Sequence, residues 1–411
     1  MARRSPGPTG PSAAWRLIRS RGFGPYFTGN AISSTGTWFQ NLAASLLVFR
    51  LTHSPFLLGV LNVAQFAPVL VLAPWTGLAA DRFDRQRLLL VTQISAASLS
   101  GTLALLAWAD LAKVWVVIAF ALALGVCSAY AAPVSMALPG QLVERPDLPS
   151  AVALNSMTYN IARAVGPALA AVTVNALGIP AAIGINSASY LALVAGLLVV
   201  KARPQAPVPR EESQLRASLR FVRERPRLLG LLLVIAAVGF ASDPVNTEAP
   251  AFAHAFGELD SKAGYLIGFF GAGAVIAALT LAGRVTGSRL RMAVTLTMLG
   301  GGIVVLSLSP WLSLAYVALF VAGFGYLASN TSATAQLQLG VEESQRGRIM
   351  ALWSVAFLGL RPIASFVDGT LAGAFGVRVA GVCLALPALA AAAVILRLRY
   401  RPLRSRETAP V

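Results

Sequence analysis

Runs of about 20 apolar residues recur along the whole chain, and each is long enough to cross a hydrocarbon layer roughly 30 Å thick. Of the 411 residues, 56% are hydrophobic and only 12% are charged, about half the charged share of an average soluble domain. A chain in lipid must satisfy its own backbone hydrogen bonds, and these runs lack the alternating pattern of barrel strands. We therefore predict an all-α polytopic membrane protein.

The apolar runs predict twelve membrane spans in two sets of six, which would form two bundles. The first six cover 24–49, 56–80, 88–109, 114–138, 149–177 and 179–200, and the second six cover 228–252, 263–285, 290–309, 311–335, 348–374 and 377–396. A segment rich in Pro and Arg separates the two sets. The expected organisation is an arm over 1–22, a bundle over 23–200, a linker over 201–227, a bundle over 228–397 and a tail over 398–411.

The distribution of basic residues predicts the orientation, because loops rich in Lys and Arg stay in the cytoplasm. With the N-terminus inside, 27 of the 33 Lys and Arg residues fall in cytoplasmic segments, and four fall outside: Arg50, Lys113, Lys262 and Arg378. Both termini are therefore expected in the cytoplasm. The net charge of +17 would favour contact with anionic lipid headgroups. Scattered over separate loops, it does not indicate nucleic-acid binding.

The two halves of the sequence resemble each other, which is a frequent property of transporters. At an offset of 198 residues, "ALNSMTYNIARAVGP" in span 5 matches "ALWSVAFLGLRPIAS" in span 11, so that Arg163 corresponds to Arg361. Likewise "DRFDRQRL" after span 2 matches "GRVTGSRL" after span 8. These matches predict a duplicated, pseudo-symmetric six-helix unit.

The charged stretch "GLAADRFDRQR" between spans 2 and 3 resembles the signature of the major facilitator superfamily of secondary transporters. The matching residues are Gly77, Asp81, Arg82, Arg85 and Arg87. The resemblance implies a cytoplasmic gating motif in which the Asp pairs with the other half. Here Asp84 replaces the second Gly of the pattern and Gln86 replaces a basic residue; the alternative reading is that this charge only fixes the topology.

The fuller pattern resembles the exporter branch that contains enterobactin-exporter-like and macrolide-efflux-like proteins. The stretches "FTGNAISSTGTWFQNLA" and "RGRIMALWSVAFLGLRP" carry this resemblance, and Gly166 and Pro167 are similar to the span 5 motif of antiporters. Span 4, however, has no Arg over residues 114–138, whereas drug/proton antiporters commonly carry one there. The resemblance implies efflux of a small molecule.

Ionisable residues inside the spans are candidates for the transport pathway, because such groups are costly in lipid and usually face a partner or a water-filled space. At 1.5 Å per residue, Arg163, Asp243 and Arg361 come out at one depth. We expect Asp243 to be the proton-responsive carboxylate, with Arg361 as its partner and Arg163 as a substrate or gating cation. Permanent ion pairs that only hold helices together are the alternative.

Further polar residues complete the predicted pathway. Glu248 and Asp368 lie nearer the outer surface and are expected to line an exit, and Asn160 shares one helix face with Arg163. Span 1 carries a polar stripe at helical spacing, which we expect to line the cavity, although such residues also hold helices together. This stripe comprises Asn30, Ser34, Thr37 and Asn41.

Motif searches exclude several classes of enzyme. The sequence has no P-loop, no H-E-x-x-H and no G-x-S-x-G pattern, and its two Cys residues have no metal-ligand spacing. We expect no enzyme activity, no metal and no cofactor. The predicted function is proton-coupled efflux of a siderophore, antibiotic or other amphipathic metabolite by alternating access, from a monomer in the bacterial cytoplasmic (inner) membrane. The alternatives are a scaffold or sensor that kept the fold, or an uptake carrier.

Overall fold

The computed structural model describes residues 11–203, 222–259, 262–281, 288–341, 349–350 and 352–397. Over these residues the protein consists of helices joined by short connections, with no strand. The N-terminal ten residues, the centre of the linker and the C-terminal tail, each predicted from the sequence, lie outside the described part. The all-helical fold predicted above is confirmed.

The N-terminal half is built from α1 to α8. These elements are α1 (Pro11–Ile18), α2 (Gly24–Thr52), α3 (Pro55–Val71), α4 (Ala73–Arg82), α5 (Arg85–Trp108), α6 (Val114–Ala137), α7 (Pro139–Leu142), the 3-10 turn η1 (Arg145–Asp147) and α8 (Leu148–Val199). Helix α8 contains both span 5 and span 6. Its backbone turns between them at Gly178, where φ is 85°. Glycine adopts this conformation without the steric cost of a Cβ atom.

The C-terminal half repeats this plan with α10 to α17. These elements are α10 (Pro226–Thr247), α11 (Ala249–Ala255), α12 (Ala263–Leu281), α13 (Arg289–Leu308), α14 (Leu312–Leu339), the π-helical turn η3 (Val355–Gly359), α16 (Arg361–Phe375) and α17 (Val377–Arg397). Gly376, with φ 88°, separates α16 from α17 as Gly178 divides α8. The duplicated sequence thus gives duplicated turns.

Helix lengths agree with twelve membrane crossings. Within the described residues, nine helices are long and apolar enough to span a bilayer. The stretch from Ser150 to Val199, one of the nine, makes two crossings because of its turn, which gives ten. Helix α2, with 29 residues, and the consecutive helices α3 and α4 supply the other two. The predicted span 2 is divided into α3 and α4, and the predicted span 7 is divided into α10 and α11. In both cases a Pro stands at the start of the second helix. Proline cannot donate the backbone hydrogen bond that a continuous helix requires.

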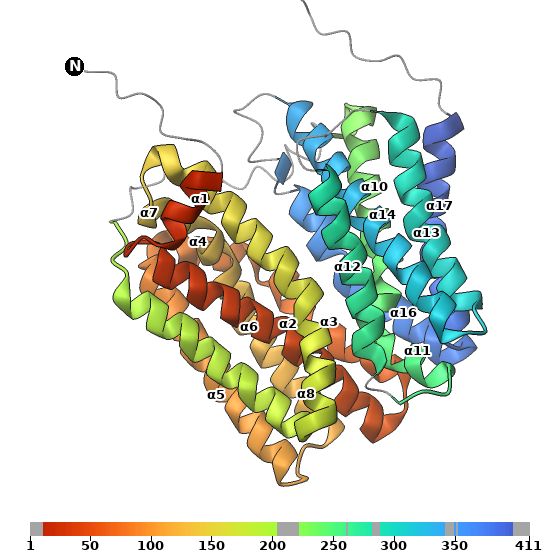
Figure 1. Cartoon of the computed structure of the whole chain (residues 1–411), viewed down its shortest axis with the longest axis horizontal. Coiled ribbons are helices and arrows are strands. Elements are labelled where there is room, and N and C mark those ends of the chain that lie inside the picture. The colour runs from red at the N-terminus through yellow and green to blue at the C-terminus, as the bar shows by residue number, and fades with distance from the viewer. Residues whose placement is uncertain are drawn as a thin grey trace, which may run out of the picture.

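The two halves lie side by side and separate towards the end that carries α1, as Figure 1 shows. We call this end, with the α4–α5 connection, the basic end, and the other end, with the α2–α3 and α11–α12 connections, the opposite end. Contacts between the halves join α3 to α16, α8 to α12 and α2 to α11. All three run through the parts of these helices nearer the opposite end, so the halves are closed there.

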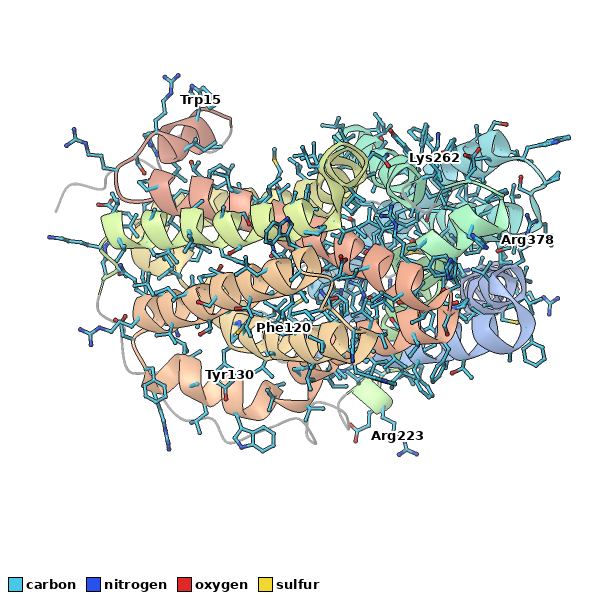
Figure 2. The ribbon with its side chains drawn as sticks, turned by 90° about the horizontal axis from the view of Figure 1, so that it is seen from below. Trp15, Phe120, Tyr130, Arg223, Lys262 and Arg378 are labelled. Carbon is cyan, nitrogen blue, oxygen red and sulfur yellow. The ribbon has the colours of Figure 1, made fainter. Side chains whose placement is uncertain are left out.

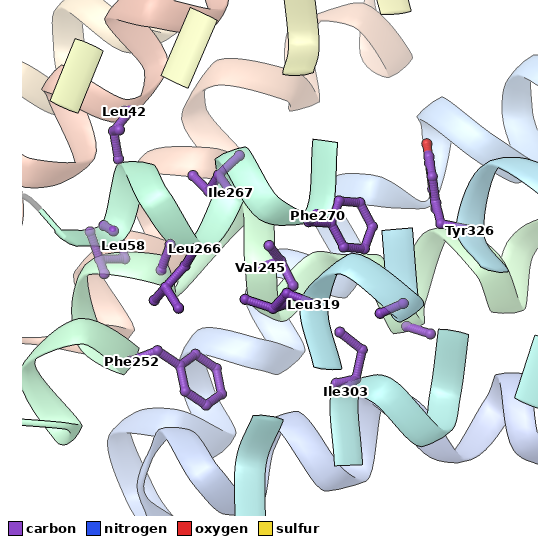
Figure 3. Packing of buried hydrophobic residues seen from close by; sticks show 14 of the residues in the cluster. Leu42, Leu58, Val245, Phe252, Leu266, Ile267, Phe270, Ile303, Leu319 and Tyr326 are labelled. Carbon is purple, nitrogen blue, oxygen red and sulfur yellow. The ribbon is translucent and has the colours of Figure 1, made fainter. Parts of the chain in front are cut away.

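A continuous apolar core crosses the boundary between the halves at the opposite end. Leu42 and Leu58 of the N-terminal half belong to the same buried cluster as Leu266 and Ile267 of α12, and Figure 3 shows them close by. Small residues allow the backbones to approach, since a Cβ added to Gly59 of α3 would lie 2.6 Å from a backbone oxygen of α16. Close packing of small residues is the main source of helix association in membranes.

Candidate functional site: two arginines between the halves

Arg163 extends from the N-terminal half into the C-terminal half. Its guanidinium donates a hydrogen bond to the hydroxyl of Tyr326 on α14 and another, of 3.4 Å, to Oδ1 of Asn246 on α10. It also lies over the Tyr326 ring, 4.5 Å from the centroid. Because Arg163 comes from α8, these contacts connect the two bundles through one side chain.

Arg361 makes the reciprocal connection. It begins α16 in the C-terminal half and lies over two rings of the N-terminal half, 4.1 Å from the centroid of Phe66 and 5.4 Å from that of Trp38. Arg163 lies 5.5 Å from the same Trp38 ring. The two arginines that the repeat equates therefore share one indole ring. Both side chains are half-buried.

Local sequence explains this placement. The π-helical turn Val355–Gly359 comes directly before Arg361, and such turns alter the direction of the following residues. On the other side, a Cβ at Gly166 would lie 2.8 Å from the oxygen of Thr35 and 2.9 Å from Cβ of Trp38. The Gly-Pro motif predicted from the sequence, Gly166 with Pro167, thus brings α8 against α2 at the height of Trp38.

Asp243 lies beside the arginines but is hydrogen-bonded to hydroxyls. It accepts hydrogen bonds from Thr247 (2.9 Å) and Ser365 (3.0 Å), and its side chain is 1% exposed. The charges of Arg361 and Arg163 act on it, that of Arg361 more strongly. Among the described residues, however, no carboxylate oxygen lies within 4 Å of a guanidinium nitrogen of either arginine, so neither arginine forms an ion pair. The structure brings the three predicted residues together without a salt bridge.

Glu248 and Asp368, predicted to line an exit, are buried side chains in this conformation. Both are fully buried, and none of their four carboxylate oxygens has a hydrogen-bond partner. Glu248 lies at the junction of α10 and α11, and Asp368 lies in the middle of α16. The side chain of Asn160, predicted to share their pathway, is outside the described part.

The polar stripe of span 1 makes hydrogen bonds inside the N-terminal bundle. Asn30 donates to Asn155 at 2.8 Å, Thr37 lies 3.3 Å from the hydroxyl of Tyr190, and Asn41 accepts from Gln65. Ser34 is half-buried. Three of the four predicted cavity residues therefore connect α2 to its own bundle, while Trp38 on the same helix faces the arginines.

At the basic end, the two departures from the family motif have structural roles. Asp84 caps α5 by accepting a 2.8 Å hydrogen bond from the backbone of Arg87, and Gln86 donates to the carbonyls of Leu197 (2.6 Å) and Val200 (3.0 Å) at the end of α8. Sequence reasoning missed both roles, although an Asp just before a helix is a recognisable cap signal.

The remaining motif residues lie in or beside this loop. Gly77 has nothing within 4 Å of an added Cβ, Arg82 is exposed, and Arg85 donates to the carbonyl of Ala80 at 3.3 Å. The side chain of Asp81 lies outside the described residues. The ribbons of the two halves lie apart at this end (Figure 1).

The rest of the described part has an apolar surface groove and no grouped metal ligands. Within it, no three His, Cys, Asp or Glu residues are grouped as a metal site. An apolar groove between α13 and α14, lined by Leu290, Val294, Val305 and Val317, contains none of the charged residues above. These four residues are exposed, as expected for a surface in contact with lipid.

Comparison with known proteins agrees with this architecture. The family model described as "Transmembrane secretion effector" matches residues 12–411. The chain is 25% identical over 405 residues to the enterobactin exporter EntS of Shigella boydii, covering 94% of each chain, and 30% identical over 148 residues to the staphyloferrin A transporter of Staphylococcus aureus, covering 36% of this chain and 37% of that one.

Solved structures show the same fold. A bacterial homologue of the human lysosomal transporter Spinster, in an inward-facing and occupied conformation, superimposes with a TM-score of 0.73 at 14% identity, covering 95% of this chain and 97% of the other. The resemblance to the exporter branch stated from the sequence is thus confirmed. The chain belongs to the transmembrane secretion effector family of the major facilitator superfamily and is a multi-pass membrane transporter.

Proposed function

We propose that this protein exports a small amphipathic molecule from the bacterial cytoplasm in exchange for protons, by alternating access of one site between its two halves. The observation that carries the proposal is the reciprocal pair Arg163 and Arg361, each reaching from one half to aromatic rings of the other. A substrate that inserts between the halves would replace these contacts. Its binding would therefore be linked directly to the rocking motion.

The chemistry of the site favours a substrate with an anionic group and a flat apolar surface. Two half-buried guanidiniums without a carboxylate ion pair can donate charge-assisted hydrogen bonds to a carboxylate or phenolate, and Trp38, Phe66 and Tyr326 offer ring faces. A siderophore, an acidic antibiotic or another amphipathic metabolite would fit. Export is supported by the family description and by the relative that is an enterobactin exporter.

The orientation follows from the charges at the two ends. The basic end carries Arg16, Arg19, Arg21 and the arginines of the α4–α5 region, whereas Lys262 and Arg378 belong to the opposite end; Figure 2 labels Trp15 of α1 and these two basic residues far apart. Basic loops remain cytoplasmic, so the basic end faces the cytoplasm of the inner membrane with both termini. The conformation is then open to the inside, and the protein acts as a monomer.

Asp243 is the proposed coupling carboxylate. It is buried, neighbours both arginines electrostatically and is hydrogen-bonded to Thr247 and Ser365 of the same bundle. Protonation would cancel its attraction for Arg361 and so free the guanidinium for the substrate or for the opposite half. A change of charge on the Asp243 carboxylate would thereby alter the contacts that Arg361 makes between the two halves.

The test has two parts. Comparing the metabolites of a deletion strain and its parent should reveal the substrate as the compound that accumulates inside the deletion strain. In proteoliposomes at clamped pH, Asp243→Asn should abolish the transport of that compound driven by a pH gradient, while the exposed control Asp110→Asn transports normally. No accumulating compound would favour a scaffold or sensor, and unchanged transport by Asp243→Asn would refute the assignment of the coupling residue.

A further inference from the structure

The side chains of Glu248 and Asp368 present an electrostatic problem that no described neighbour solves. Both are completely buried, and all four of their carboxylate oxygens lack a hydrogen-bond donor. Asp243, nearby, has two hydroxyl donors and two arginines in range. Protein groups therefore solvate the carboxylate of Asp243, whereas none donates a hydrogen bond to Glu248 or Asp368.

The hydroxyls around Asp243 join the two segments that carry these residues. Thr247, which immediately precedes Glu248, lies 3.3 Å from Ser365, measured between the two hydroxyl oxygens. Asp368 is one helical turn beyond Ser365 on α16. The charge of Asp368 acts on Glu248, and the charge of Asp243 acts on both.

The described helices around the two acids carry few basic side chains: Arg50, near the end of α2, is exposed, and Lys262, before α12, lies 5.6 Å from the ring centroid of Tyr265. Helix α3, which packs against α16, contains no ionisable residue. On α17, Arg378 is directed to backbone carbonyls, donating to Ser309 at 2.8 Å. His53 of α2 and His254 of α11 pack against Phe49, with ring centroids 5.6 and 5.7 Å from it.

The two central arginines, Arg163 and Arg361, contact aromatic rings, and Arg163 also donates to Tyr326 and Asn246. Neither arginine donates a hydrogen bond to Glu248 or Asp368.

Two ionised carboxylates cannot persist in such surroundings. An isolated carboxylate that is transferred into an apolar medium loses most of its solvation free energy, and proteins respond by protonating the group. Two carboxylates that share one site repel each other, which favours a proton on one of them further. The buried arrangement is therefore compatible with neutral acids and not with two anions.

The location of the pair connects its protonation to the closed state. Asp368 is next to Gly369, whose Cα would meet a Cβ added to Gly59 of the other half at 3.0 Å. Helices α3 and α16 approach each other closely here, in the part where the halves are closed. When the halves separate at the opposite end, this contact opens and water reaches α16.

We propose that Glu248 and Asp368 are a proton-binding pair that closes the opposite end of the transporter when protonated and opens it when ionised. In the outward-open form, each proton passes from external water to a carboxylate oxygen, and the neutral acids are then buried as α3 and α16 meet. Opening returns the same protons to water. The inference rests on the proposed alternating access and adds a proton site distinct from Asp243.

The protons return to the side from which they came, so the pair makes closure depend on the external pH and leaves coupling to the proton gradient to Asp243. External protons would close the opposite end after the substrate has left and so return the empty carrier to a form in which that end is closed, as it is in this structure. By linkage, the ratio of closed to open molecules falls about tenfold per pH unit for each proton released on opening, and about a hundredfold per unit for two.

The test measures conformation without any substrate, so that it stands apart from the transport assay. Spin labels at Leu51→Cys and Leu259→Cys, both exposed positions near the opposite end on different halves, would report the separation there by pulsed electron resonance. Cys127 and Cys383 are replaced by Ser in this background. We expect the long-distance population to grow as the pH rises.

The variant Glu248→Gln/Asp368→Asn carries permanently neutral side chains of the same shape and should remain closed at every pH. Glu258→Gln, in the connection after α11 and half-buried, is the matched control and should behave as the parent protein. A pH response of the double variant equal to that of the parent would overturn the proposal.

A second measurement protects the test against misfolding of the variant. Infrared spectroscopy of the unmodified protein at neutral pH should show the C=O stretch of a protonated carboxylic acid, which moves on exchange into D2O and is reduced in Glu248→Gln alone and in Asp368→Asn alone. Absence of this band from the unmodified protein would also overturn the proposal.

Discussion

Gly59 offers a direct perturbation of the closed contact between the halves. In the closed form a Cβ at this position would lie 2.6 Å from the backbone oxygen of Ser365 and 3.0 Å from Cα of Gly369. Real Cβ atoms do not approach a backbone oxygen so closely, so α3 and α16 would have to move apart. Gly59→Ala should therefore destabilise the closed contact specifically.

The size of the effect follows from the cost of overpacking. Inserting a methyl group into a well-packed contact costs about 1–3 kcal/mol, and here the cost applies only when the halves meet. At about 1.4 kcal/mol per factor of ten, the ratio of closed to open molecules should fall by roughly 5- to 150-fold. The bundles themselves keep their internal contacts.

Two pairs of spin labels would measure this change. The pair Leu51→Cys and Leu259→Cys should become more distant in Gly59→Ala, and the pair Phe83→Cys and Leu339→Cys, exposed near the basic end, should become closer. The control is Gly301→Ala, also inside a membrane helix, where an added Cβ meets nothing within 4 Å.

Two outcomes would contradict this role of Gly59. If Gly59→Ala leaves both distance distributions as they are in Gly301→Ala, then α3 and α16 do not limit closure. A fall in melting temperature without a change in distances would show that the methyl group disturbs folding instead. Gly273→Ala provides that reference, because its clash with Phe320 lies within one bundle.

Two further changes test the site and the basic end. Trp38→Leu removes the ring shared by Arg163 and Arg361, so it should lower the free energy of unfolding by about 1–4 kcal/mol for two cation–π contacts. Trp38→Phe keeps an aromatic ring and should recover part of the melting temperature measured in detergent. Equal melting temperatures for both variants would contradict the contact. Gln86→Ala leaves the carbonyls of Leu197 and Val200 without their donor and should cost about 1–3 kcal/mol. An unchanged melting temperature would show that water replaces the amide.

Much of the architecture was predictable from single residues and their spacing. Gly178 and Gly376 divide adjacent spans in both repeats, and both have the positive φ that glycine permits. The equivalence of Arg163 and Arg361, inferred at an offset of 198 residues, is matched by their shared contact with Trp38. The depth estimate likewise grouped Asp243 with these arginines, because a helix rises by a constant amount per residue.

Other parts of the site depended on rotations that the sequence does not specify. The polar residues of α2 were expected to face the pathway, but Asn30, Thr37 and Asn41 contact their own bundle. The stripe shows that these residues share a face and not which neighbour that face meets. Trp38 was absent from the prediction because an aromatic residue in an apolar span gives no separate signal.

The amino-acid sequence was sufficient to predict that this chain is a duplicated helical membrane protein. Hydrocarbon leaves helices as the only spanning structure for such runs, and repeated residues require repeated turns. Tertiary structure alone decided which charges meet, since Asp243 found hydroxyls while Glu248 and Asp368 were buried without a donor. Those outcomes depend on how helices from different halves rotate and pack against one another, and spacing along one helix contains no information about its neighbours.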